Sequence, residues 1–498
     1  MCERHGAHLS RRTFFVAGGA ALVGTVFPAA AEAEAEETRT VTGRFEPGAP
    51  DWYYLPVTVP AGVREIEVRY RYDRPQPPPG LPGNALDIGC FDPSGHDLGD
   101  HRGFRGWSGG FRDGFVINAG DATPGYLPGP IEPGTWHVIL GPYTVAPQGM
   151  NYAVDVTLRY GPSGPPHIPV PAPERARGRG RAWYRGDCHL HTMHSDGHRT
   201  PGQLAAAARA AGLDFVASTE HNTPSAGLRW GEHAGPDLLI IDGEEVTTRS
   251  GHWLALGLPV GHWIDWRYRA EEPDRFRRFR DEVRAVGGLT VAAHPYCPYV
   301  GCSWGFGYRD VDLVEVWNGP WTADDEHAVR TWHDLLCAGH WVPAMGNSDA
   351  HSESDVVGLP QTVVFADDLA TRSILAGLRA GRAWLAESSR VGLALRASGP
   401  GAHGARPAGI GQRLRVGPGA PVDVVLEVSG APGCEVRLIT PGGVAHSAAV
   451  PASGSAVVRW STRAREAAWV RAEVRRPVPT DTTPDTMVAL TNPIFLGV

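Results

Sequence analysis

Between residues 183 and 388, short apolar runs alternate with segments that carry helix-start and helix-end signals. Short apolar runs of this kind, separated by helices, are typical of buried strands in a parallel sheet or an α/β barrel. The fold class that this pattern predicts is therefore α/β. The expected strands cover residues 215–217, 238–241, 289–293, 311–316 and 342–345.

Four helices are expected between these strands. The first begins with a capping box formed by Thr200 and Gln203, has Pro201 at its first helical position, and ends at Gly212. The other three are expected over residues 273–286, over residues 322–339 with acidic residues in the first turn, and over residues 368–380.

The segments on either side of this region have a β pattern. Residues 39–160 alternate apolar and polar residues between Pro/Gly turns and predict a small β-sandwich. This domain would serve in carbohydrate or surface attachment, or it would simply pack against the central α/β domain. Residues 161–182 are rich in Pro, Gly and Arg and are expected to be a linker. The α/β domain is expected over residues 183–390, and a second, smaller β-domain over residues 391–498.

The first 31 residues are expected to be a signal peptide. The segment Ser10-Arg11-Arg12-Thr13-Phe14-Phe15 is similar to the twin-arginine consensus, an apolar stretch follows it, and Ala29 and Ala31 offer a cleavage site. The alternative is an amphipathic leader in which the Arg-Arg pair has no role. The first interpretation predicts twin-arginine export to the extracellular space or cell envelope, and no transmembrane segment is expected elsewhere.

Histidine and carboxylate motifs follow the apolar runs of the central region. Because the carboxyl ends of barrel strands converge on one face, these motifs are expected to meet in one site. Imidazole and carboxylate together are ligands for Zn, Mn or Fe, and a hydrolase is the function that such a multinuclear centre predicts. The motifs are His189-Leu190-His191 with Asp196, Glu220-His221, Gly243-Glu244-Glu245, Gly251-His252, Ala293-His294-Pro295 and Asp349-Ala350-His351.

The amino-acid composition excludes catalytic mechanisms and binding sites that depend on lysine. The 498 residues contain no lysine, so all 46 basic residues are arginine, and a Walker-type phosphate lysine, a Schiff-base lysine and a Ser-Lys dyad are excluded. The net charge of −8 argues against a stable nucleic-acid partner bound through bulk charge. Cys297 and Cys302 are close enough in sequence to form a disulfide, or they remain free thiols.

Over residues 183–390 these motifs, together with Val316-Trp317-Asn318-Gly319, resemble the PHP (polymerase and histidinol phosphatase) superfamily. The chain is most similar to its CehA/McbA-like metallohydrolases. The resemblance implies a distorted (β/α)7 barrel, flanked here by the N-terminal β-sandwich and the small C-terminal β-domain.

The resemblance also implies three divalent ions (Zn, Mn or Fe) and a metal-bridging hydroxide. His189, His191, Glu245 and Asp349 would hold one ion. Asp196, His221 and His351 would hold a second ion. Glu245, His252 and His294 would hold a third, with Glu245 as the bridge, and catalytic roles are expected for Glu245, Asp349 and His351. Glu220 stands where the family usually has Asp, and Glu244 is expected to point away from the metals because strand neighbours face opposite sides.

The expected substrate is a small-molecule ester, with phosphate-containing substrates favoured, including phosphomonoesters and nucleotide or oligonucleotide phosphates. Arg199, Arg249 and Asn318 are the candidate substrate-binding residues, since arginine binds phosphate through two parallel hydrogen bonds. The alternative is a carbamate or aryl-ester hydrolase, because eight tryptophans between residues 253 and 341 could line a site for a flat apolar group. A third possibility is a non-catalytic exported binding module.

Overall fold

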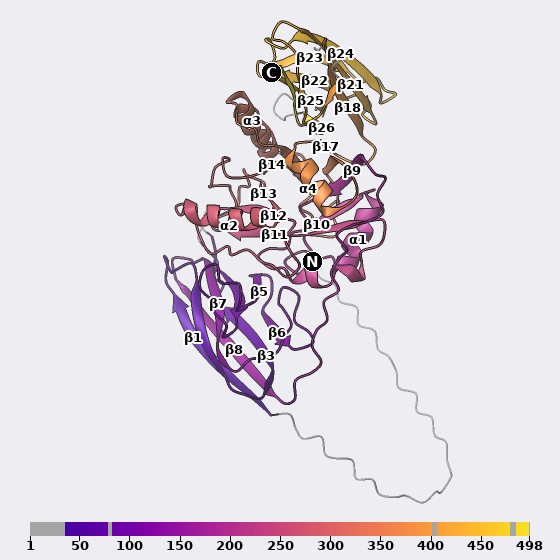
Figure 1. The fold of residues 1–498 in the computed structure, drawn as a ribbon. Helices are drawn as coiled ribbons and strands as arrows, with labels where there is room; N and C mark the ends of the chain where they lie inside the picture. Colours follow the sequence, from indigo (N-terminus) through magenta and orange to yellow (C-terminus); the bar gives the residue numbers. More distant parts are fainter. Residues whose placement is uncertain (1–34, 78–81, 401–405, 479–484, 498) are drawn as a thin grey trace, which may run out of the picture.

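A computed structural model describes residues 35–77, 82–400, 406–478 and 485–497, and the expected signal peptide lies outside the described residues. Two four-stranded antiparallel sheets form the N-terminal part, which is drawn in indigo and violet in Figure 1. Their inner faces share one core that includes Ile66, Ile88, Trp136 and Val154. We call them the N-terminal sheets; in spatial order they are β1 (Glu36–Phe45), β8 (Met150–Tyr160), β3 (Val63–Tyr72), β6 (Gly114–Asn118), and β2 (Tyr53–Val59), β7 (Gly134–Thr144), β4 (Ala85–Phe91), β5 (Phe104–Gly109).

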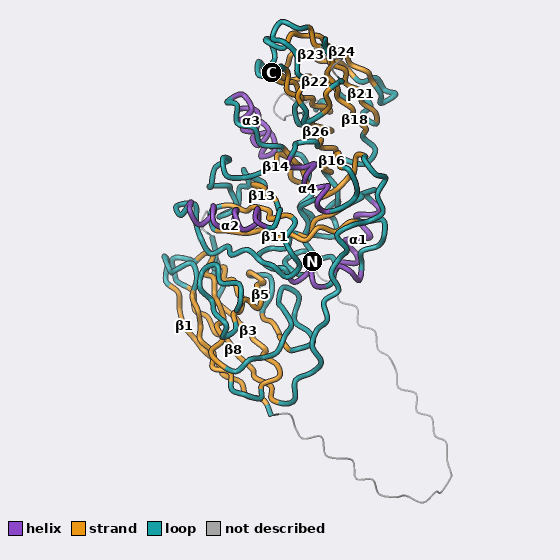
Figure 2. The backbone as a smooth tube through the Cα atoms, viewed as in Figure 1, coloured by secondary structure: helices purple, strands orange, loops and turns teal. Residues whose placement is uncertain are grey.

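The central part contains the four helices expected from the sequence, separated by strands (Figure 2). Thr200 and Gln203 make the expected capping box of α1 (Pro201–Ala210). The remaining helices are α2 (Pro273–Ala285), α3 (Ala323–Cys337) and α4 (Thr371–Arg379). The strands are β9 (Ala182–Asp187), β10 (Phe215–Ser218), β11 (Leu239–Thr248), β12 (Gly251–Leu256), β13 (Leu289–Ala292), β14 (Leu313–Asn318), β15 (Ala344–Asn347), β16 (Gln361–Ala366) and β17 (Ala383–Ala386).

The pairing of these strands is only partly parallel. Strands β9, β10 and β11 pair in parallel, and so do β13, β14 and β15. Between the two sets, β12 pairs antiparallel with both β11 and β13. The cause is a hairpin: Arg249 and Ser250 connect β11 directly to β12 without a crossover helix, and Gly251 takes the positive φ of +115° that follows the turn.

The segments that follow β9 and β15 run side by side. The backbone N–H of Asp349 donates to the carbonyl of His189 at 2.9 Å, and the N–H of His191 donates to the carbonyl of Ala350 at 3.3 Å. On the other side, the Thr362 hydroxyl of β16 hydrogen bonds with the backbone of Gly346 in β15. Hydrogen bonds therefore connect the segment after β9, near the start of the central region, with β15 and β16, near its end.

The C-terminal part, drawn in yellow at the top of Figure 1, continues the central sheet across the expected boundary at residue 390. Strand β26 pairs with β17, and the order then runs through β25, β22 and β23. A separate four-stranded sheet packs against this extension. The strands here are β18 (Gly392–Ser398), β19 (Ala408–Gly409), β20 (Arg413–Leu414), β21 (Pro421–Ser429), β22 (Glu435–Thr440), β23 (Gly443–Ala449), β24 (Ala456–Arg463), β25 (Trp469–Arg476), β26 (Thr486–Thr491) and β27 (Ile494–Leu496).

One hydrophobic core joins all three parts. It contains Phe104 and Trp107 of the N-terminal sheets, Trp263 and Trp266 of the central part, and Trp469 of β25. The N-terminal sheets therefore pack directly against the central region through this shared core. Within the described ranges, every helix is too short or too polar to cross a lipid bilayer.

Candidate metal centre

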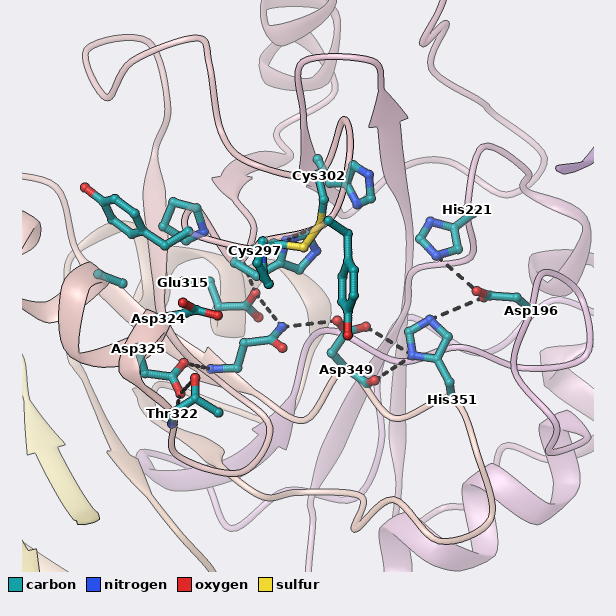
Figure 3. Close-up of a pocket in the computed structure, with 18 residues that line it drawn as sticks. Asp196, His221, Cys297, Cys302, Glu315, Thr322, Asp324, Asp325, Asp349 and His351 are labelled. Atoms are coloured by element: carbon teal, nitrogen blue, oxygen red, sulfur yellow. Dashed lines mark hydrogen bonds and ion pairs between the residues drawn. A yellow bond between two sulfur atoms is a disulfide. The ribbon is translucent and has the colours of Figure 1, made fainter. Parts of the chain in front are cut away.

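The structure brings all nine expected metal ligands to one place, on the side of the central sheet that faces the N-terminal sheets. Their ligand atoms form overlapping groups in which the atoms of each group lie within 4.8 Å of one another. Figure 3 shows part of this cluster around Asp196, His221, Asp349 and His351. The nine residues are His189, His191, Asp196, His221, Glu245, His252, His294, Asp349 and His351.

The first group combines two imidazoles with two carboxylates. Nε2 of His191 lies 3.0 Å from Oδ1 of Asp349 and 3.3 Å from Oε2 of Glu245. Nε2 of His189 lies 3.3 Å from each of the same two oxygens. Two imidazole nitrogens and two carboxylate oxygens therefore converge on one point. A divalent ion needs ligand atoms of these kinds.

The second group is centred on Asp196. Its Oδ1 atom lies 3.5 Å from Nε2 of His221 and 3.3 Å from Nε2 of His351. Thr247 hydrogen bonds to Nδ1 of His221 at 2.5 Å, and the carbonyl of Asp349 accepts from Nδ1 of His351 at 2.7 Å. These bonds fix the orientation of both rings and leave Nε2 directed at Asp196.

The third group is built on the β11–β12 hairpin. Oε1 of Glu245 lies 3.0 Å from Nδ1 of His252 and 3.0 Å from Nε2 of His294. The sequence predicts a strand that ends at Ile241, before Glu245, whereas β11 continues through the polar segment to Thr248 and contains Glu245. His252 is the second residue of β12. Cross-strand pairing of Thr247 with His252 puts the two ligands on the same face of the hairpin.

Glu245 belongs to two groups, and Glu244 belongs to none. Glu244 is buried on the opposite face, where it accepts a hydrogen bond from the Ile264 N–H at 3.0 Å. Burial raises the pKa of Glu244 well above its usual range. Burial also opposes ionisation of Glu245, but the surrounding imidazoles, His221 first, outweigh it and lower the pKa of Glu245 well below its usual range. The two neighbours are therefore a neutral core residue and an anionic site residue.

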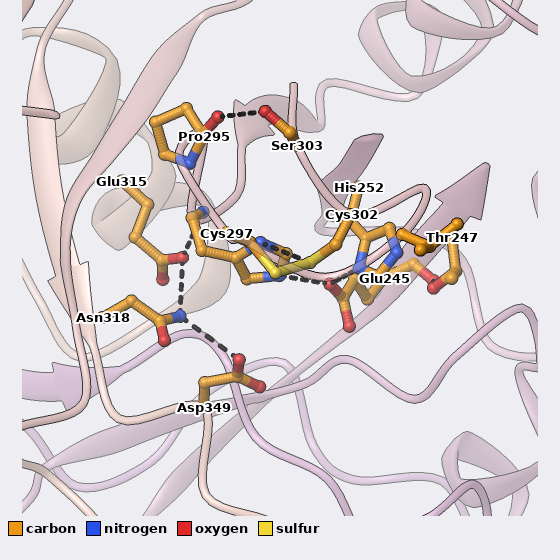
Figure 4. The surroundings of a disulfide bond; sticks show 12 residues. Glu245, Thr247, His252, Pro295, Cys297, Cys302, Ser303, Glu315, Asn318 and Asp349 are labelled. Carbon is orange, nitrogen blue, oxygen red and sulfur yellow. Dashed lines mark hydrogen bonds and ion pairs between the residues drawn. A yellow bond between two sulfur atoms is a disulfide. The ribbon is translucent and has the colours of Figure 1, made fainter. Parts of the chain in front are cut away.

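A disulfide closes the loop beside the third group. Cys297 and Cys302 are bonded to each other, and Figure 4 shows them next to His252 and Glu245. Sγ of Cys302 lies 3.5 Å from Nδ1 of His294. Because this sulfur is in a disulfide and is no thiolate, we do not count Cys302 as a metal ligand.

Backbone strain is concentrated in the same place. Among the described residues other than glycine, positive φ angles occur at Asn222 (53°), His294 (24°) and Asp349 (50°). Two of these are expected ligands, and Asn222 directly follows His221. Such conformations cost on the order of 1–3 kcal/mol each and persist where the surrounding structure requires them, most often at functional sites.

Several ligand atoms are buried without a hydrogen-bond partner, and this is the observation that tests whether metal ions fit. Buried polar groups almost always find a partner, because an unsatisfied one is costly. Six such atoms belong to the expected ligands, whose ligand atoms lie within 4.8 Å of one another in each group, so the donor set fits divalent cations. They are Nε2 of His189, His191 and His252, Oδ1 of Asp196 and Asp349, and Oε2 of Glu245.

Two carboxylates support these ligands; sequence reasoning missed Glu315 and had singled out Glu220 only as a position outside the nine ligands. Glu315 of β14 lies 3.2 Å from Nδ1 of His189 and accepts hydrogen bonds from the His294 backbone N–H, Asn318 and Asn347. The only local signal is a carboxylate within a buried apolar strand. Glu220 accepts from the Thr192 N–H and hydroxyl and from the Ser195 hydroxyl, so it supports the loop between His191 and Asp196.

The three expected substrate-binding residues have different surroundings. Arg199 is buried and donates to the carbonyls of Ser352, Glu353 and Asp355 at 2.6–2.9 Å. These bonds direct its guanidinium to the loop that follows His351. Asn318 lies within the site, with Nδ2 3.3 Å from Oδ2 of Asp349. Arg249 occupies the turn of the β11–β12 hairpin, where its guanidinium lies against the rings of Trp52 and Tyr143.

Two cavities open onto the ligand cluster. The first has a volume of about 520 Å³ and is lined by ligands together with Glu315, Asn318, Tyr296 and acidic residues of α3 (Figure 3). The second has a volume of about 420 Å³ and lies between the ligands and the N-terminal sheets. Asp196, His221 and His252 line both cavities, so the two spaces meet at the metal centre.

The tryptophans that suggested an aromatic site are mostly core residues. Trp253, Trp263, Trp317 and Trp332 are almost fully buried in the joint core, and of the eight only Trp266 lines the second cavity. The aromatic wall of that cavity comes from Trp52, Trp107, Phe111 and Tyr143 of the N-terminal part instead.

Comparisons with known proteins place the chain only loosely. No family model matches it. It is similar to an uncharacterized protein of Methanocaldococcus jannaschii, with 29% identity over 152 residues that cover 27% of this chain and 81% of the relative.

Among solved structures, a two-domain protein of Bacteroides vulgatus described as containing a predicted PHP-like metal-dependent phosphoesterase has a TM-score of 0.35 and 16% identity. The match covers 65% of this chain and 98% of that one. An amidohydrolase of Chromobacterium violaceum has a TM-score of 0.25 and 18% identity, and the match covers 35% and 89% of the two chains. Because both TM-scores lie below 0.5, these likenesses carry no argument about mechanism.

Proposed function

We propose that the protein is a metal-dependent hydrolase of the PHP type that acts as a phosphoesterase on a small molecule. The supporting observation is the convergence of nine His, Asp and Glu residues whose buried ligand atoms lack hydrogen-bond partners. The order of the ligands along the chain also follows the PHP motifs.

The residues divide into three proposed ion sites. His189, His191, Glu245 and Asp349 would hold one ion, and Asp196, His221 and His351 a second. Glu245, His252 and His294 would hold a third, with Glu245 shared between sites. Divalent ions, Zn, Mn or Fe, would lower the pKa of bound water to near neutrality and stabilise negative charge that develops on a substrate oxygen.

The remaining chemistry belongs to the side chains. Glu245 is a buried anion and Asp349 a half-buried one, and both bring negative charge to the centre of the site, while the His351 side chain is more exposed. We assign these three the catalytic roles. Asn318 presents an amide within reach of Asp349 and lines the first cavity, where it would position a substrate oxygen.

A second candidate function is hydrolysis of a carbamate or aryl ester, as in CehA/McbA-like enzymes. The aromatic wall of the second cavity favours it, since such a wall suits a flat apolar leaving group. The first cavity also presents acidic residues of α3, which are poor neighbours for a phosphate dianion.

Two structural expectations belong to the same proposal. We propose that β9 to β15 form the distorted seven-stranded barrel of the PHP fold; the backbone hydrogen bonds between the segments after β9 and β15 support this. We also propose export by the twin-arginine route, which carries folded proteins and would suit a centre loaded with metal before export.

The test combines metal analysis with parallel activity assays. The purified protein is assayed against a p-nitrophenyl phosphate panel and against aryl carbamates and aryl esters, beside His189→Ala and Asp349→Ala. Phosphatase activity that both variants lose supports the proposal, and carbamate or ester turnover without phosphate turnover supports the second candidate. A metal-loaded protein that hydrolyses none of these would instead favour a non-catalytic exported binding module.

A further inference from the structure

The second cavity has no role in the proposed phosphoesterase chemistry, yet it adjoins the cluster of expected metal ligands. Asp196, His221 and His252 form one of its sides. Trp52, Trp107 and Tyr143 of the N-terminal sheets form the opposite side. A molecule that reaches the ligands from this side must therefore pass between two parts of the fold that are far apart in sequence.

The wall of this cavity is aromatic. Trp52 and Trp107 make an edge-to-face contact with ring centroids 5.7 Å apart, and Trp266 contacts both of them. Phe111, which is 63% exposed, stands at the rim. Flat apolar groups gain the most from such surroundings, because they bury area against ring faces and edges.

The side chain of Arg249 places a guanidinium group among these aromatic rings. Arg249 is buried at the hairpin turn between Glu245 and His252, and its guanidinium lies 4.1 Å from the ring centroid of Tyr143 and 4.9 Å from that of Trp52. Its Nε and Nη2 atoms are buried without a hydrogen-bond partner. The nearest carboxylate oxygen belongs to Asp87 and is 3.8 Å from Nη2, which is too far for a hydrogen bond.

Buried donors without an acceptor are costly, and a guanidinium presents its donors in a fork that matches a carboxylate or a similar oxygen anion. The rings that hold Arg249 fix its plane but satisfy none of its N–H groups. The hairpin also places it only four residues from Glu245 and three from His252 in the chain. Arg249 also lines the same cavity as Asp196, His221 and His252, so an acceptor bound here would share that cavity with these expected ligands.

We propose that the second cavity binds an aromatic portion of the substrate that carries an anionic oxygen group, with the ring against Trp52 and Phe111 and the anion on Arg249. The N-terminal sheets then take part in substrate selection. The inference rests on the proposed hydrolase function only in calling the occupant a substrate; the binding itself can be measured without turnover.

The test uses 2-naphthoate and its uncharged counterpart, 2-naphthalenemethanol, titrated calorimetrically into the full chain. Arg249→Gln should weaken naphthoate binding by about tenfold, because a charge-assisted hydrogen bond is lost, and leave the alcohol unchanged. Trp52→Ala and Phe111→Ala should weaken both probes. Trp460→Ala, which removes a half-buried tryptophan in β24, is the matched control and should change neither.

Absence of naphthoate binding by the wild-type chain would overturn the inference, and so would wild-type affinity for naphthoate in Arg249→Gln. If the buried Arg249 variant does not fold, Phe111→Ala decides alone, since an exposed rim residue can be replaced without loss of buried contacts. Unchanged affinity for both probes in that variant again overturns the inference. Failure of the proposed function is a separate observation, namely probe binding without hydrolysis of any ester.

Discussion

Nδ1 of His189 lies 3.2 Å from Oε1 of Glu315, and both side chains are completely buried. Metal-binding imidazoles usually donate their second N–H to a carboxylate or carbonyl, which fixes the tautomer and the ring orientation. Glu315 supplies that acceptor here and leaves Nε2 of His189 directed at Glu245 and Asp349. It therefore positions a ligand without being a ligand itself.

The first prediction concerns this pair. Glu315→Gln should lower the affinity for the bound metal by about 10- to 100-fold, because the amide no longer holds His189 as an anionic acceptor does. Metal content after dialysis against a graded series of chelator concentrations measures the change. Glu244→Gln, which alters a buried acid outside the cluster, is the control and should retain metal as the wild type does.

A second prediction separates the two neighbouring glutamates. Glu245→Gln should remove most of the bound metal and the hydrolytic activity, since two ligand groups share this carboxylate. Glu244→Gln should keep both, because burial raises the pKa of Glu244 so far that the side chain is already neutral and an amide replaces it closely. Metal loss in Glu244→Gln with retention in Glu245→Gln would reverse the assignment.

The cluster of His, Asp and Glu residues could be predicted from the sequence because each residue lies in a short motif beside an apolar run. His294 and Asp349, for example, directly follow β13 and β15. Local sequence also defined the starts of α1 and α3, since the residues of their capping boxes lie within one turn of the helix start. Within residues 183–390, the sequence therefore predicted those features that depend on residues close together in the chain.

The features that were not predicted depend on partners that are distant in sequence. Glu315 contacts a histidine 126 residues away, and Arg249 stacks on rings from β7 and from the segment before β2. The β11–β12 hairpin was missed for a related reason. Glu244 and Glu245 look like the end of a strand, but both lie inside β11, where each carboxyl group has a partner elsewhere in the chain: the Ile264 N–H for Glu244 and His252 for Glu245.

A third prediction concerns a pH-dependent contact between the N-terminal part and α2. Oε1 of Glu282 accepts from Nε2 of His101 at 2.8 Å and from Nε2 of His262 at 2.7 Å. The hydrogen bond to Glu282 raises the pKa of His101, with Asp265 acting in the same direction and Arg278 against it. Burial opposes ionisation of Glu282, but His101 and His262 outweigh it and lower its pKa to about 2.

The raised pKa of His101 and the lowered pKa of Glu282 together define the pH range in which this contact stabilises the fold. A raised histidine pKa gives stability that is complete below about pH 6.5 and is lost as the pH rises through the folded-state value. A lowered glutamate pKa gives stability that is complete above about pH 4.5 and is lost as the pH falls toward 2. Glu282→Gln should therefore lower the thermal midpoint, measured by calorimetry, most between about pH 4.5 and 6.5 and least at pH values above the raised pKa of His101. The exposed Glu271→Gln should show no such dependence, and an equal loss at all pH values would contradict this account.

The last prediction concerns the attachment of the C-terminal sheet to α3. Glu473 of β25 is buried between Arg471 and Arg475, with an N–O distance of 2.6 Å to each, and Arg475 also reaches Glu326 of α3 at 2.7 Å. Burial opposes ionisation of Glu473, but the two arginines outweigh it and lower its pKa to about 2. The contribution of Glu473 to the folding stability is therefore complete above about pH 4.5 and is lost only as the pH falls toward 2.

Glu473→Gln should destabilise the protein by about 3–5 kcal/mol at pH 7, because it leaves two buried guanidinium groups without their shared counter-charge. Urea unfolding followed by tryptophan fluorescence measures this loss. Glu427→Gln removes an exposed partner of Arg396 at 3.6 Å and should cost less than about 1 kcal/mol. Metal content should stay at the wild-type level in both variants, since neither residue contacts the ligand cluster. Equal stability of the two variants would mean that the buried arginines find other partners when Glu473 is neutral.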